Sequence, residues 1–398
     1  MINDRRFDGV LIVGGGATGI IIAEMLEDRG VSALLVEQQG LAGGQTAHCH
    51  GYLHRGYAYR RLSARERGEL NEGADWWEGR AARSGSQDAI SSPASVIAYP
   101  TREEARRAWR SWAAAGAVDG VRAMSAPGIA GVQAAFTVPE RTIVPRSVLR
   151  LPGSSQEVLI GQAITVIADG PDISAIDVVA SGHVTRISAV SYVLAAGLGI
   201  PVLVVGGATS FRERVSFMLV CETSAEIPHA FCLPSDEAQG LFAVSRARPG
   251  HRAFLLSNFA SFLPSGDYGV AMAFWLRGMG RLLARFVPMI WDDDHAAWGI
   301  YAASKLESAG PRAWVPGGAV TTCGWRNGVV VAPGKLVLAP VYARRAVSLI
   351  EGMLGSLTVA KPGRRRVQPA DAWASEDWER VGKVSRRQLI RDAEAMLL

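Results

Sequence analysis

The sequence predicts an α/β protein of two domains, and three observations support this fold class. The chain has 398 residues, more than one simple core usually serves. Near the N-terminus an apolar run (10–13) is followed by a helical segment (20–29) and a second apolar run (33–36), which is the order of a parallel β-α-β unit. Between residues 215 and 275 several short strand-like runs instead indicate an antiparallel sheet in a second domain.

The first strand and helix are joined by a GxGxxG pattern, formed by Gly14, Gly15, Gly16, Ala17, Thr18 and Gly19. Gly14 permits a tight turn, Gly16 lets a pyrophosphate approach the backbone, and Gly19 lets the helix pack closely on the strand. The helix N-terminus then faces the phosphates. Glu37 ends the second strand, where it can accept hydrogen bonds from an adenosine ribose. The sequence therefore predicts a Rossmann-type domain that binds a dinucleotide.

Composition excludes several other classes of protein. The 42 basic and 37 acidic residues are scattered, apart from Arg364-Arg365-Arg366, so no nucleic-acid footprint is expected. The four cysteines lie far apart without CxxC spacing, which predicts thiols in a reducing cytoplasm and neither a disulfide framework nor a metal site. No stretch offers 18 uninterrupted apolar residues and no signal-peptide core precedes the first strand, so we expect no integral membrane contact.

The middle of the chain carries further strand and helix signals. We expect a helix over 62–85, a strand over 96–99, and a helix that Thr101 and Glu104 open as a capping box. Runs of β-branched residues predict strands over 163–167, 173–180 and 190–194, the last returning to the first sheet. Gly206-Gly207-Ala208 lacks a third glycine, so it predicts no second dinucleotide site.

Two segments carry concentrated basic charge. Arg277, Arg281 and Arg285 recur every fourth residue opposite apolar positions, which predicts an amphipathic helix. Its basic face is either solvated or, as the alternative, lies on a membrane surface. Residues 364–398 form a basic tail that ends in a charged helix, and we interpret it as a packing or docking segment.

Several separated segments resemble one family. The loop Gly43–Gly51 (GGQTAHCHG), the strand end Ala195-Ala196-Gly197, the segment Pro139–Leu149 and above all Gly324–Pro333 (GWRNGVVVAP) are similar to segments of the D-amino-acid oxidase superfamily. This superfamily includes glycine and sarcosine oxidases, dimethylglycine dehydrogenase and glycerol-3-phosphate dehydrogenase. The resemblance implies a D-amino-acid oxidase-like fold and FAD, rather than NAD, as the tightly held cofactor.

The resemblance also implies which residues contact FAD. Besides the glycine pattern and Glu37, these are Gln38, Gly44, Gln45, Thr46, His48, Val166, Ala196, Gly197, Gly324, Arg326, Asn327, Gly328 and Val329. His48 falls where dimethylglycine and sarcosine dehydrogenases carry a histidine bonded to the flavin. Covalent attachment through His48 and a hydrogen-bonding role for it are both open. His54 lies in a stretch that resembles the segment beside the reactive side of the flavin in glycerol-3-phosphate dehydrogenases, where it would act as a base or serve as a structural histidine.

The sequence also departs from the family pattern. The arginine that holds the carboxylate in amino-acid oxidases is missing near 299–306, where Lys305 offers the only such charge, without the bidentate geometry of arginine. Trp325 replaces a histidine, and Arg312–Gly318 replaces a proline-rich run. These changes favour a larger substrate than a free amino acid, with Tyr57 and Trp325 as stacking surfaces.

We therefore expect an FAD-dependent oxidoreductase that oxidises a C–N or C–O bond by hydride transfer to the flavin, on a larger, non-standard small molecule of a biosynthetic pathway. Oxygen and a carrier protein are both open as electron acceptors, and Lys305 is expected as a catalytic residue that attracts superoxide by its charge. The alternative is a flavin-binding subunit that needs a partner protein. A homo-oligomer or an electron-acceptor protein is compatible with both. The resemblance assigns 1–85, 146–210 and 311–363 to the FAD-binding domain, 86–145 and 211–310 to the substrate domain, and 364–398 to the tail.

Overall fold

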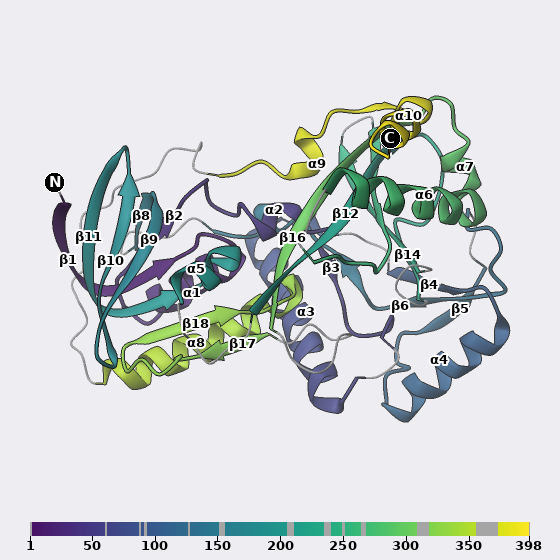
Figure 1. Ribbon diagram of the computed structural model, residues 1–398. Helices are drawn as coiled ribbons and strands as arrows, with labels where there is room; N and C mark the ends of the chain where they lie inside the picture. The colour runs from purple at the N-terminus through teal and green to yellow at the C-terminus, as the bar shows by residue number, and fades with distance from the viewer. Residues whose placement is uncertain are drawn as a thin grey trace.

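The computed structural model describes residues 2–59, 62–86, 89–90, 94–125, 128–150, 156–204, 211–234, 240–248, 251–263, 268–308, 318–355 and 373–397. Within these ranges the chain forms two lobes, each built on its own sheet, and the two termini lie at opposite ends of the molecule (Figure 1). The sequence features at Gly206–Ala208, Arg312–Gly317 and Arg364–Arg366 fall outside the described residues.

The first sheet has eight strands in the described part of the chain, in the order β17-β18-β11-β1-β2-β8, with β10 and β9 continuing from β11 as antiparallel neighbours. Strand β1 is parallel to both β2 and β11, as the β-α-β pattern predicts. Residues 10–13 and 33–36 are buried because helices or strands cover both faces of the sheet. The strands are β1 Ile2–Val13, β2 Ala33–Glu37, β8 Gln156–Ile160, β9 Gln162–Asp169, β10 Asp172–Ala180, β11 His183–Leu194, β17 Ala319–Thr321 and β18 Gly328–Ala332.

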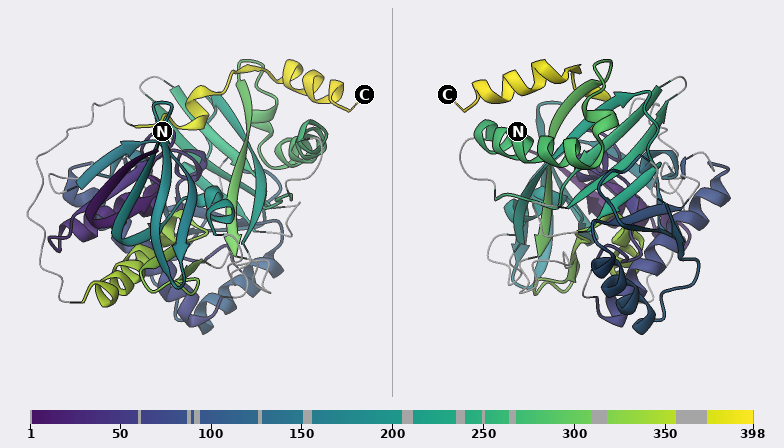
Figure 2. Two further views of the ribbon diagram at one scale, coloured as in Figure 1. Left: turned by 60° about the vertical axis from the view of Figure 1, so that its left-hand side comes forward. Right: turned by 90° about the vertical axis from the view of Figure 1, so that its right-hand side faces the viewer.

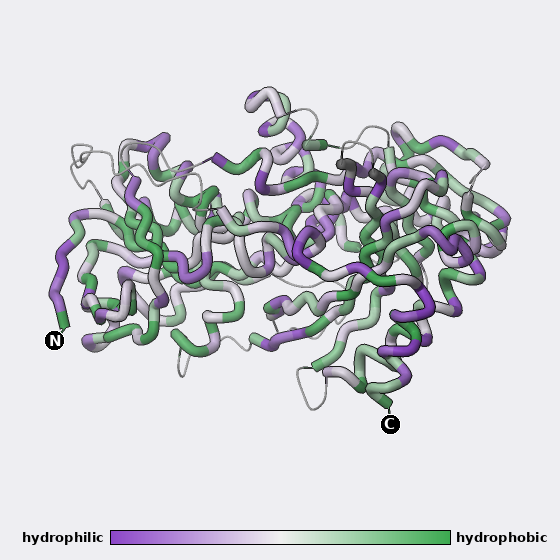
Figure 3. The backbone as a smooth tube through the Cα atoms, turned by 90° about the horizontal axis from the view of Figure 1, so that it is seen from above, coloured by the Kyte–Doolittle hydropathy of each residue, from purple (hydrophilic) through white to green (hydrophobic). Residues whose placement is uncertain are grey.

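The N-terminal half of β1 differs from its buried second half. Its residues are mostly exposed and polar, and Figure 3 shows them as a hydrophilic strip at the outer edge of the first lobe. One face of the sheet packs against α1 (Ala17–Glu27), α3 (Ala64–Ser84) and α8 (Ala339–Leu354) in a single apolar core. The other face packs against β10 and the short helix α5 (Ile200–Leu203).

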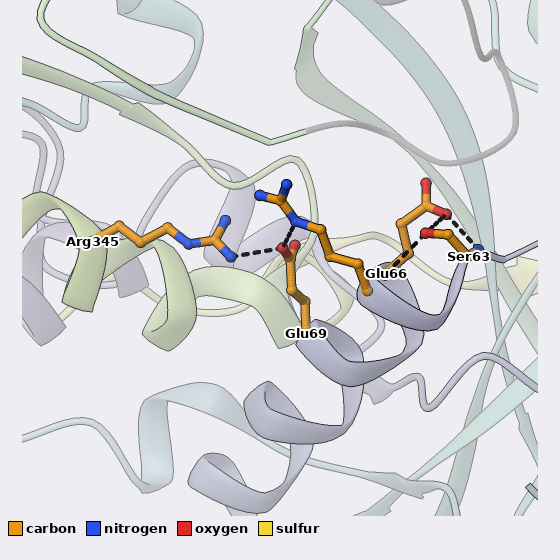
Figure 4. A network of polar contacts seen from close by, with 5 residues as sticks. Ser63, Glu66, Glu69 and Arg345 are labelled. Atoms are coloured by element: carbon orange, nitrogen blue, oxygen red, sulfur yellow. Dashed lines mark hydrogen bonds and ion pairs between the residues drawn. The ribbon is translucent and has the colours of Figure 1, made fainter. Parts of the chain in front are cut away.

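Helix α3 is fixed at its start and along its length by polar contacts (Figure 4). Ser63 caps it, because the Glu66 amide donates to Ser63 Oγ at 3.2 Å and the Ser63 amide donates to Glu66 Oε2 at 2.7 Å. Glu69 accepts hydrogen bonds from Arg65 at 3.0 Å and from Arg345 of α8 at 2.6 Å. These contacts hold α3 against the last helix of the first lobe.

The second sheet has nine strands among the described residues, in the order β19-β16-β12-β15-β14-β13-β4-β6-β5. It is antiparallel as predicted, except that β13 pairs with β4 in parallel. The strands are β4 Ser95–Tyr99, β5 Arg122–Met124, β6 Ala134–Val138, β12 Phe211–Thr223, β13 Ala230–Leu233, β14 Leu241–Arg248, β15 His251–Ser257, β16 Ala297–Ser308 and β19 Val384–Ser385. A small pair, β3 (Tyr52–Leu53) and β7 (Arg141–Thr142), lies apart from both sheets.

Helices cover the second sheet on both sides. Helices α6 (Tyr268–Phe286), α7 (Pro288–Trp291) and α10 (Arg386–Ala395) share one apolar core with the sheet, and α4 (Arg102–Ala114) packs in another. Three short helices (α2 Gln45–His48, η2 Pro145–Ser147 and η4 Leu336–Leu338) and α9 (Asp377–Arg380) complete the fold, with η3 (Gly197–Gly199) before α5.

The predicted capping box and amphipathic helix are both confirmed. Thr101 caps α4 and Glu104 completes the reciprocal contact. In α6 the three arginines of the basic face are exposed, while Met279 and Leu283 are buried on the opposite face. Among the helices that the structure describes, none is both long and apolar enough to cross a membrane.

Candidate active site

A cavity of about 600 Å³ lies between the two lobes, within the usual range of about 300–1,000 Å³ for ligand sites. The first lobe contributes the carboxyl ends of parallel strands, Val13 of β1, Val36 of β2 and Ala332 of β18. Ligands of open parallel sheets bind at this edge. The second lobe contributes side chains from β12, β14 and β16, so the cavity joins a nucleotide-type edge to a second wall of different chemistry.

At the first-lobe end, two glycines allow backbone contacts that no other residue would allow. Gly14 has φ 109°, and a Cβ there would lie 2.4 Å from the Ala195 carbonyl oxygen. A Cβ on Gly19 would lie 1.9 Å from the Gly14 carbonyl oxygen. The close approach predicted for Gly19 is therefore present, and it packs helix against strand at the edge where the cavity begins.

Backbone amides and two side chains organise the same end. Glu37 accepts from the amides of Gly15 at 2.7 Å and Gln39 at 2.9 Å. Thr46 Oγ1 accepts from the Ala17 amide at 2.9 Å, which fixes the start of α2 against the start of α1. A Cβ on Gly44 would meet nothing within 4 Å although Gly44 lines the cavity, so the backbone there is open to a ligand.

Most of the residues that the sequence assigns to the cofactor lie together along this cavity. They are Gly14, Gly16, Ala17, Thr18, Glu37, Gln38, Gly44, Gln45, Thr46, His48, Ala196 and Gly197. A long, narrow ligand with a phosphate-bearing middle fits this donor set, because the glycines and the α1 N-terminus leave backbone amides toward it.

The segment Gly324–Val329 and Val166, which the resemblance also assigns to the cofactor, lie outside the described lining of this cavity. Strand β18 runs parallel to β11, so Ala332 faces the cavity while Gly328 begins the strand at the opposite edge of the sheet. There Arg326 donates to Asp172 at 3.0 Å. The side-chain amide of Asn327 accepts from the Ile173 amide at 2.8 Å and donates to the Ile173 carbonyl at 2.9 Å. These contacts tie β18 to β10 and are structural.

The other four members of that set also lie outside the cavity lining. Gly324 forms an exposed turn before β18, and Gly328 and Val329 are buried in the strand. Val166 pairs with Ile176 in the β9–β10 hairpin and packs on its core. None of them is among the described residues that line the cavity.

The part of this region that does reach the cavity is the next segment along the chain, which the sequence analysis missed. It consists of Pro333, Gly334, Lys335, Leu336, Val337 and Ala339, at the start of α8. The signal was present, because a buried apolar strand followed by Pro-Gly predicts a turn at the carboxyl edge of the sheet.

Lys335 is the most unusual group in that segment. Its Nζ donates to Tyr59 Oη at 2.6 Å, and burial lowers the pKa of Lys335 to about 8 against a partly opposing effect of Glu307. Burial also raises the pKa of the Tyr59 hydroxyl, so this hydroxyl stays protonated at neutral pH. The pair places a cation that titrates near neutrality on the cavity wall.

His54 lies beside this pair, among aromatic rings. It stacks on Tyr52 with ring centroids 4.5 Å apart and meets Tyr59 edge-on at 5.6 Å. Burial, with the charge of Lys335, lowers the pKa of His54 well below its ordinary value. The neighbouring His50 has a pKa lowered to about 3, again mainly by burial. Both histidines are therefore neutral at physiological pH, and in this buried state each is a weak base that can accept a hydrogen bond.

Glu140 positions the loop that carries His54, and the sequence analysis did not identify it. This carboxylate is fully buried, and its Oε1 accepts from the amides of Arg55 at 2.6 Å, Gly56 at 2.9 Å and Tyr57 at 3.3 Å. Burial raises the pKa of Glu140, while the three amide donors oppose the rise. Because the donors follow His54 directly, Glu140 fixes the backbone on which His54 stands.

His48 lines the cavity but both of its nitrogens are engaged or enclosed. Nε2 lies 2.8 Å from Oδ2 of Asp377, which belongs to the C-terminal segment. Nδ1 is buried and has no hydrogen-bond partner in the described part of the chain. The His48 carbonyl oxygen accepts from the Tyr301 hydroxyl at 3.2 Å. His48 is thus held from two sides.

Lys305 lies in the same cavity as His54, and its Nζ pairs with Glu307 at 2.8 Å. The two residues expected to stack on the substrate, Tyr57 and Trp325, are not among the described residues that line the cavity. Tyr57 is buried and meets Trp112 edge-on at 5.2 Å, and Trp325 packs beside Gly328 and Ile173. The aromatic rings that do line the cavity are Tyr52, Tyr59, Phe242 and Phe259.

No group of three histidine, cysteine or acidic side chains within the described ranges is placed to hold a metal ion.

Comparison with curated proteins gives short local matches. The chain is 45% identical over 56 residues to one of the subunits of the anaerobic glycerol-3-phosphate dehydrogenase of Escherichia coli (strain K12), and 44% identical over 55 residues to one of those of the Haloferax volcanii enzyme. Each match covers 14% of this chain, and 10% and 9% of the respective relatives. The similarity is thus confined to about a tenth of the length of those proteins.

Solved structures share the whole fold at low sequence identity. An FAD dependent oxidoreductase from Pseudomonas aeruginosa superposes with a TM-score of 0.68 at 21% identity, covering 95% of this chain and 99% of that one. Glycine oxidase from Geobacillus kaustophilus gives 0.68 at 16% identity, covering 92% and 100%. L-proline dehydrogenase from P. horikoshii gives 0.67 at 11% identity, covering 90% and 96%.

The family model described as FAD dependent oxidoreductase matches residues 9–339, which include the glycine-rich turn, the His54 loop, Lys305 and Lys335. That range covers most of the chain and both walls of the cavity. The chain therefore belongs to the family of FAD dependent oxidoreductases.

Proposed function

We propose that this flavoenzyme oxidises the carbon next to nitrogen in an amine that also carries an acidic group. The observation that carries the proposal is one cavity in which a dinucleotide edge meets an uncharged histidine, His54, and two lysines, Lys305 and Lys335. Glycine oxidase and L-proline dehydrogenase, whose names indicate amino-acid substrates, share the fold. Oxidation of a C–O bond is the competing outcome of the test below.

FAD would be held along the edge already described. Glu37 and Gln38 would receive the adenosine, and Gly16, Ala17 and Thr18 would face the pyrophosphate. The segment 333–339 and His48 would border the ring. When bound, FAD supplies the acceptor for the hydride that leaves the substrate carbon. The charge of Lys335 and the amides at the start of α8 favour negative charge on that side of the cavity.

His54 suits the proton transfer that amine oxidation needs. An amine reaches the enzyme mostly as ammonium, and its nitrogen must lose a proton before the neighbouring carbon loses hydride. His54 lies on the cavity wall and is neutral because burial depresses its pKa, so it can accept a hydrogen bond from the ammonium group. For His54 to take the proton, the bound substrate must raise that pKa toward neutrality. Lys305 and Lys335 would attract the acidic group of the substrate as point charges, without the bidentate fit of an arginine.

FAD attachment is proposed to be non-covalent. A covalent bond to His48 would use one of its ring nitrogens, and Nε2 is paired with Asp377 while Nδ1 is buried. Acid precipitation of the purified protein tests this directly. We expect the yellow colour to pass to the supernatant. Colour that stays in the pellet, and disappears in His48→Ala, would show that His48 is bonded to the flavin.

Anaerobic flavin reduction tests the proposed reaction. The protein is mixed with a panel of secondary and primary amino acids, larger aromatic amino acids, amines without an acidic group, and hydroxy acids, and bleaching of the flavin band is followed. We expect bleaching with acidic amines, and a rate at least about 100-fold lower in His54→Gln, as removal of a general base predicts. Bleaching by hydroxy acids alone would assign the enzyme to C–O oxidation.

A second function is supported by the local relatives, which are named as subunits of a dehydrogenase. On this alternative the chain is a flavin-binding subunit that passes electrons to a partner protein. Size-exclusion chromatography with and without lysate, followed by single-protein flavin reduction, separates the two. Reduction of the flavin by substrate in the isolated chain contradicts the need for a partner. The larger biosynthetic substrate and the cytoplasmic location stay predictions from the sequence.

A further inference from the structure

The C-terminal segment Trp373–Leu397 lies beyond the residues that the family model matches, yet it touches both lobes. In Figures 1 and 2 it runs along one side of the molecule from the first lobe to the second. At its start the Ala374 amide donates to the Leu41 carbonyl at 2.9 Å. At its end β19 pairs with β16, and Leu389 of α10 packs in the core under α6. The segment is therefore anchored at both ends.

Its middle contacts the loop that borders the cavity. Asp377 Oδ2 lies 2.8 Å from His48 Nε2, and both side chains are mostly buried. The next residue, Trp378, is 4% exposed and packs against Met218 and Val220 of β12. Asp377 is thus carried on a backbone that the second lobe holds in place.

A second contact lies behind the same loop. Glu376 and Arg246 are both buried, with Oε2 and Nε 4.0 Å apart. The Arg246 guanidinium lies against Gly51, since a Cβ on Gly51 would come within 2.6 Å of Nη2. Asp377 therefore contacts one end of the stretch 48–51 directly, and Glu376 reaches the other end only through Arg246.

The contact to Asp377 decides which nitrogen of His48 carries the proton. A carboxylate accepts a hydrogen bond, so Nε2 must carry hydrogen and Nδ1 must not when the imidazole is neutral. The same contact fixes the plane of the ring, as a carboxylate does for metal-bound histidines. Tyr301, which holds the His48 carbonyl, prevents the backbone from following if the ring turns.

We propose that Asp377 is a positioning residue of the cofactor site, which from outside the cavity lining fixes the ring and the tautomer of His48 on the wall that receives FAD. This proposal rests on the proposed FAD site. The C-terminal segment, which lies outside the family match, thereby contributes to cofactor affinity. It acts on His48 of the first lobe and is anchored on the second lobe by Trp378.

The test compares Asp377→Ala and Asp377→Asn with Lys383→Met. Lys383 lies in the same segment and pairs with Glu222 at 3.0 Å, away from His48, so its variant loosens the segment without touching the histidine. FAD is removed from each full-length protein, and rebinding is measured by quenching of flavin fluorescence. We expect a roughly tenfold rise in the FAD Kd for Asp377→Ala, the loss of one charge-assisted hydrogen bond, a smaller rise for Asp377→Asn, and no change for Lys383→Met.

A second readout does not depend on flavin. Nitrogen-15 spectra of histidine-labelled apoprotein, with His48→Gln for assignment, report the tautomer of His48. We expect hydrogen on Nε2 in the wild type and in Lys383→Met, and a mixture of tautomers in Asp377→Ala. An unchanged tautomer, or an equal loss of FAD affinity in Lys383→Met and Asp377→Ala, would overturn the proposal. A wild-type protein that binds no FAD would instead overturn the proposed function, while the tautomer measurement still tests the contact.

Discussion

The two ends of the cavity are built in different ways. The dinucleotide end comes mainly from the first 48 residues, with Ala196 and Gly197 added after β11, and it presents backbone amides, glycines and the Glu37 carboxylate. The opposite end is assembled from residues far apart in the chain, among them His54, Phe242, Lys305 and Lys335. It presents two lysines, neutral histidines and aromatic rings. One end recognises its ligand by shape and backbone, whereas the other does so by charge and proton affinity.

This difference has a consequence for mutation. At the dinucleotide end the same atoms pack the fold and receive the ligand, so a substitution should cost stability and cofactor together. At the opposite end, within the described part of the chain, Lys305 and Lys335 make side-chain contacts only, to Glu307 and to Tyr59. Substitutions there should change the chemistry while FAD remains bound. Variants at the two ends can test this separation.

The largest effect is expected for Gly19→Ala. The new Cβ would lie 1.9 Å from the Gly14 carbonyl oxygen, so helix α1 would have to move off β1. We expect a loss of about 3 kcal/mol of unfolding free energy or more and purification without FAD. Urea denaturation and the visible spectrum measure the two. The matched control is Gly68→Ala in α3, where a Cβ meets nothing within 4 Å and alanine should be neutral or stabilising by about 0.5–1 kcal/mol. Equal losses in both variants would contradict this expectation.

The next effect is expected for Glu140→Ala, at the opposite end. Three backbone amides of 55–57 would lose their acceptor in a buried site. We expect about 2–3 kcal/mol of destabilisation, together with a larger loss of the His54-dependent reduction rate than stability alone explains. Glu140→Gln keeps an acceptor oxygen and should recover most of both quantities. A Glu140→Ala protein that reduces its flavin at the wild-type rate would show that the His54 loop does not need this carboxylate.

Lys335→Met should leave FAD bound and alter the pH dependence. The pKa of Lys335 is lowered to about 8 from an ordinary value of 10.5, so between these two values the unfolded chain binds more protons than the folded one. Stability should therefore rise with pH across that window in the wild type relative to Lys335→Met. Flavin reduction should fall as the pH rises through about 8, because the cation is lost, and the variant should lack that fall. Lys335→Arg, which stays charged, should remain active at high pH.

Lys305 provides the comparison for Lys335. Its ammonium is already paired with Glu307 and partly exposed, so its charge is less available to the cavity. We expect Lys305→Met to change oxygen reactivity and substrate affinity less than Lys335→Met does. Stopped-flow reoxidation of the reduced enzyme measures the first quantity, and the concentration dependence of flavin reduction measures the second. A greater effect for Lys305→Met would show that Lys305, and not Lys335, supplies the charge that acts on oxygen and substrate in the cavity.

The contrast between the two ends also explains what the sequence could and could not predict. The β-α-β unit, Gly14, Gly19 and Glu37 are local, so pattern and spacing are sufficient to predict them. The segment Gly324–Val329 resembles a family motif, and that likeness alone assigns it to the cofactor. Only the parallel pairing of β18 with β11 shows that the motif begins at the sheet edge opposite the cavity. The segment that follows β18, 333–339, is the part that lines the cavity. Glu140 and Asp377 could not be found from sequence, because their partners lie 83–85 and 329 positions away.

The smallest effect is expected at Tyr57, an aromatic residue of the core that we compare with Phe242, an aromatic residue of the cavity wall. Tyr57 packs edge-on against Trp112, while Phe242 lines the cavity with His54. Tyr57→Phe keeps the ring, so the substrate concentration that half-saturates flavin reduction should stay within about twofold of the wild type, since no ligand contact is lost. Phe242→Ala should raise that concentration and leave FAD content unchanged. If Tyr57→Phe raises the half-saturating substrate concentration as much as Phe242→Ala does, the Tyr57 hydroxyl contacts the substrate. The substrate site would then extend beyond the described cavity lining, into the second lobe.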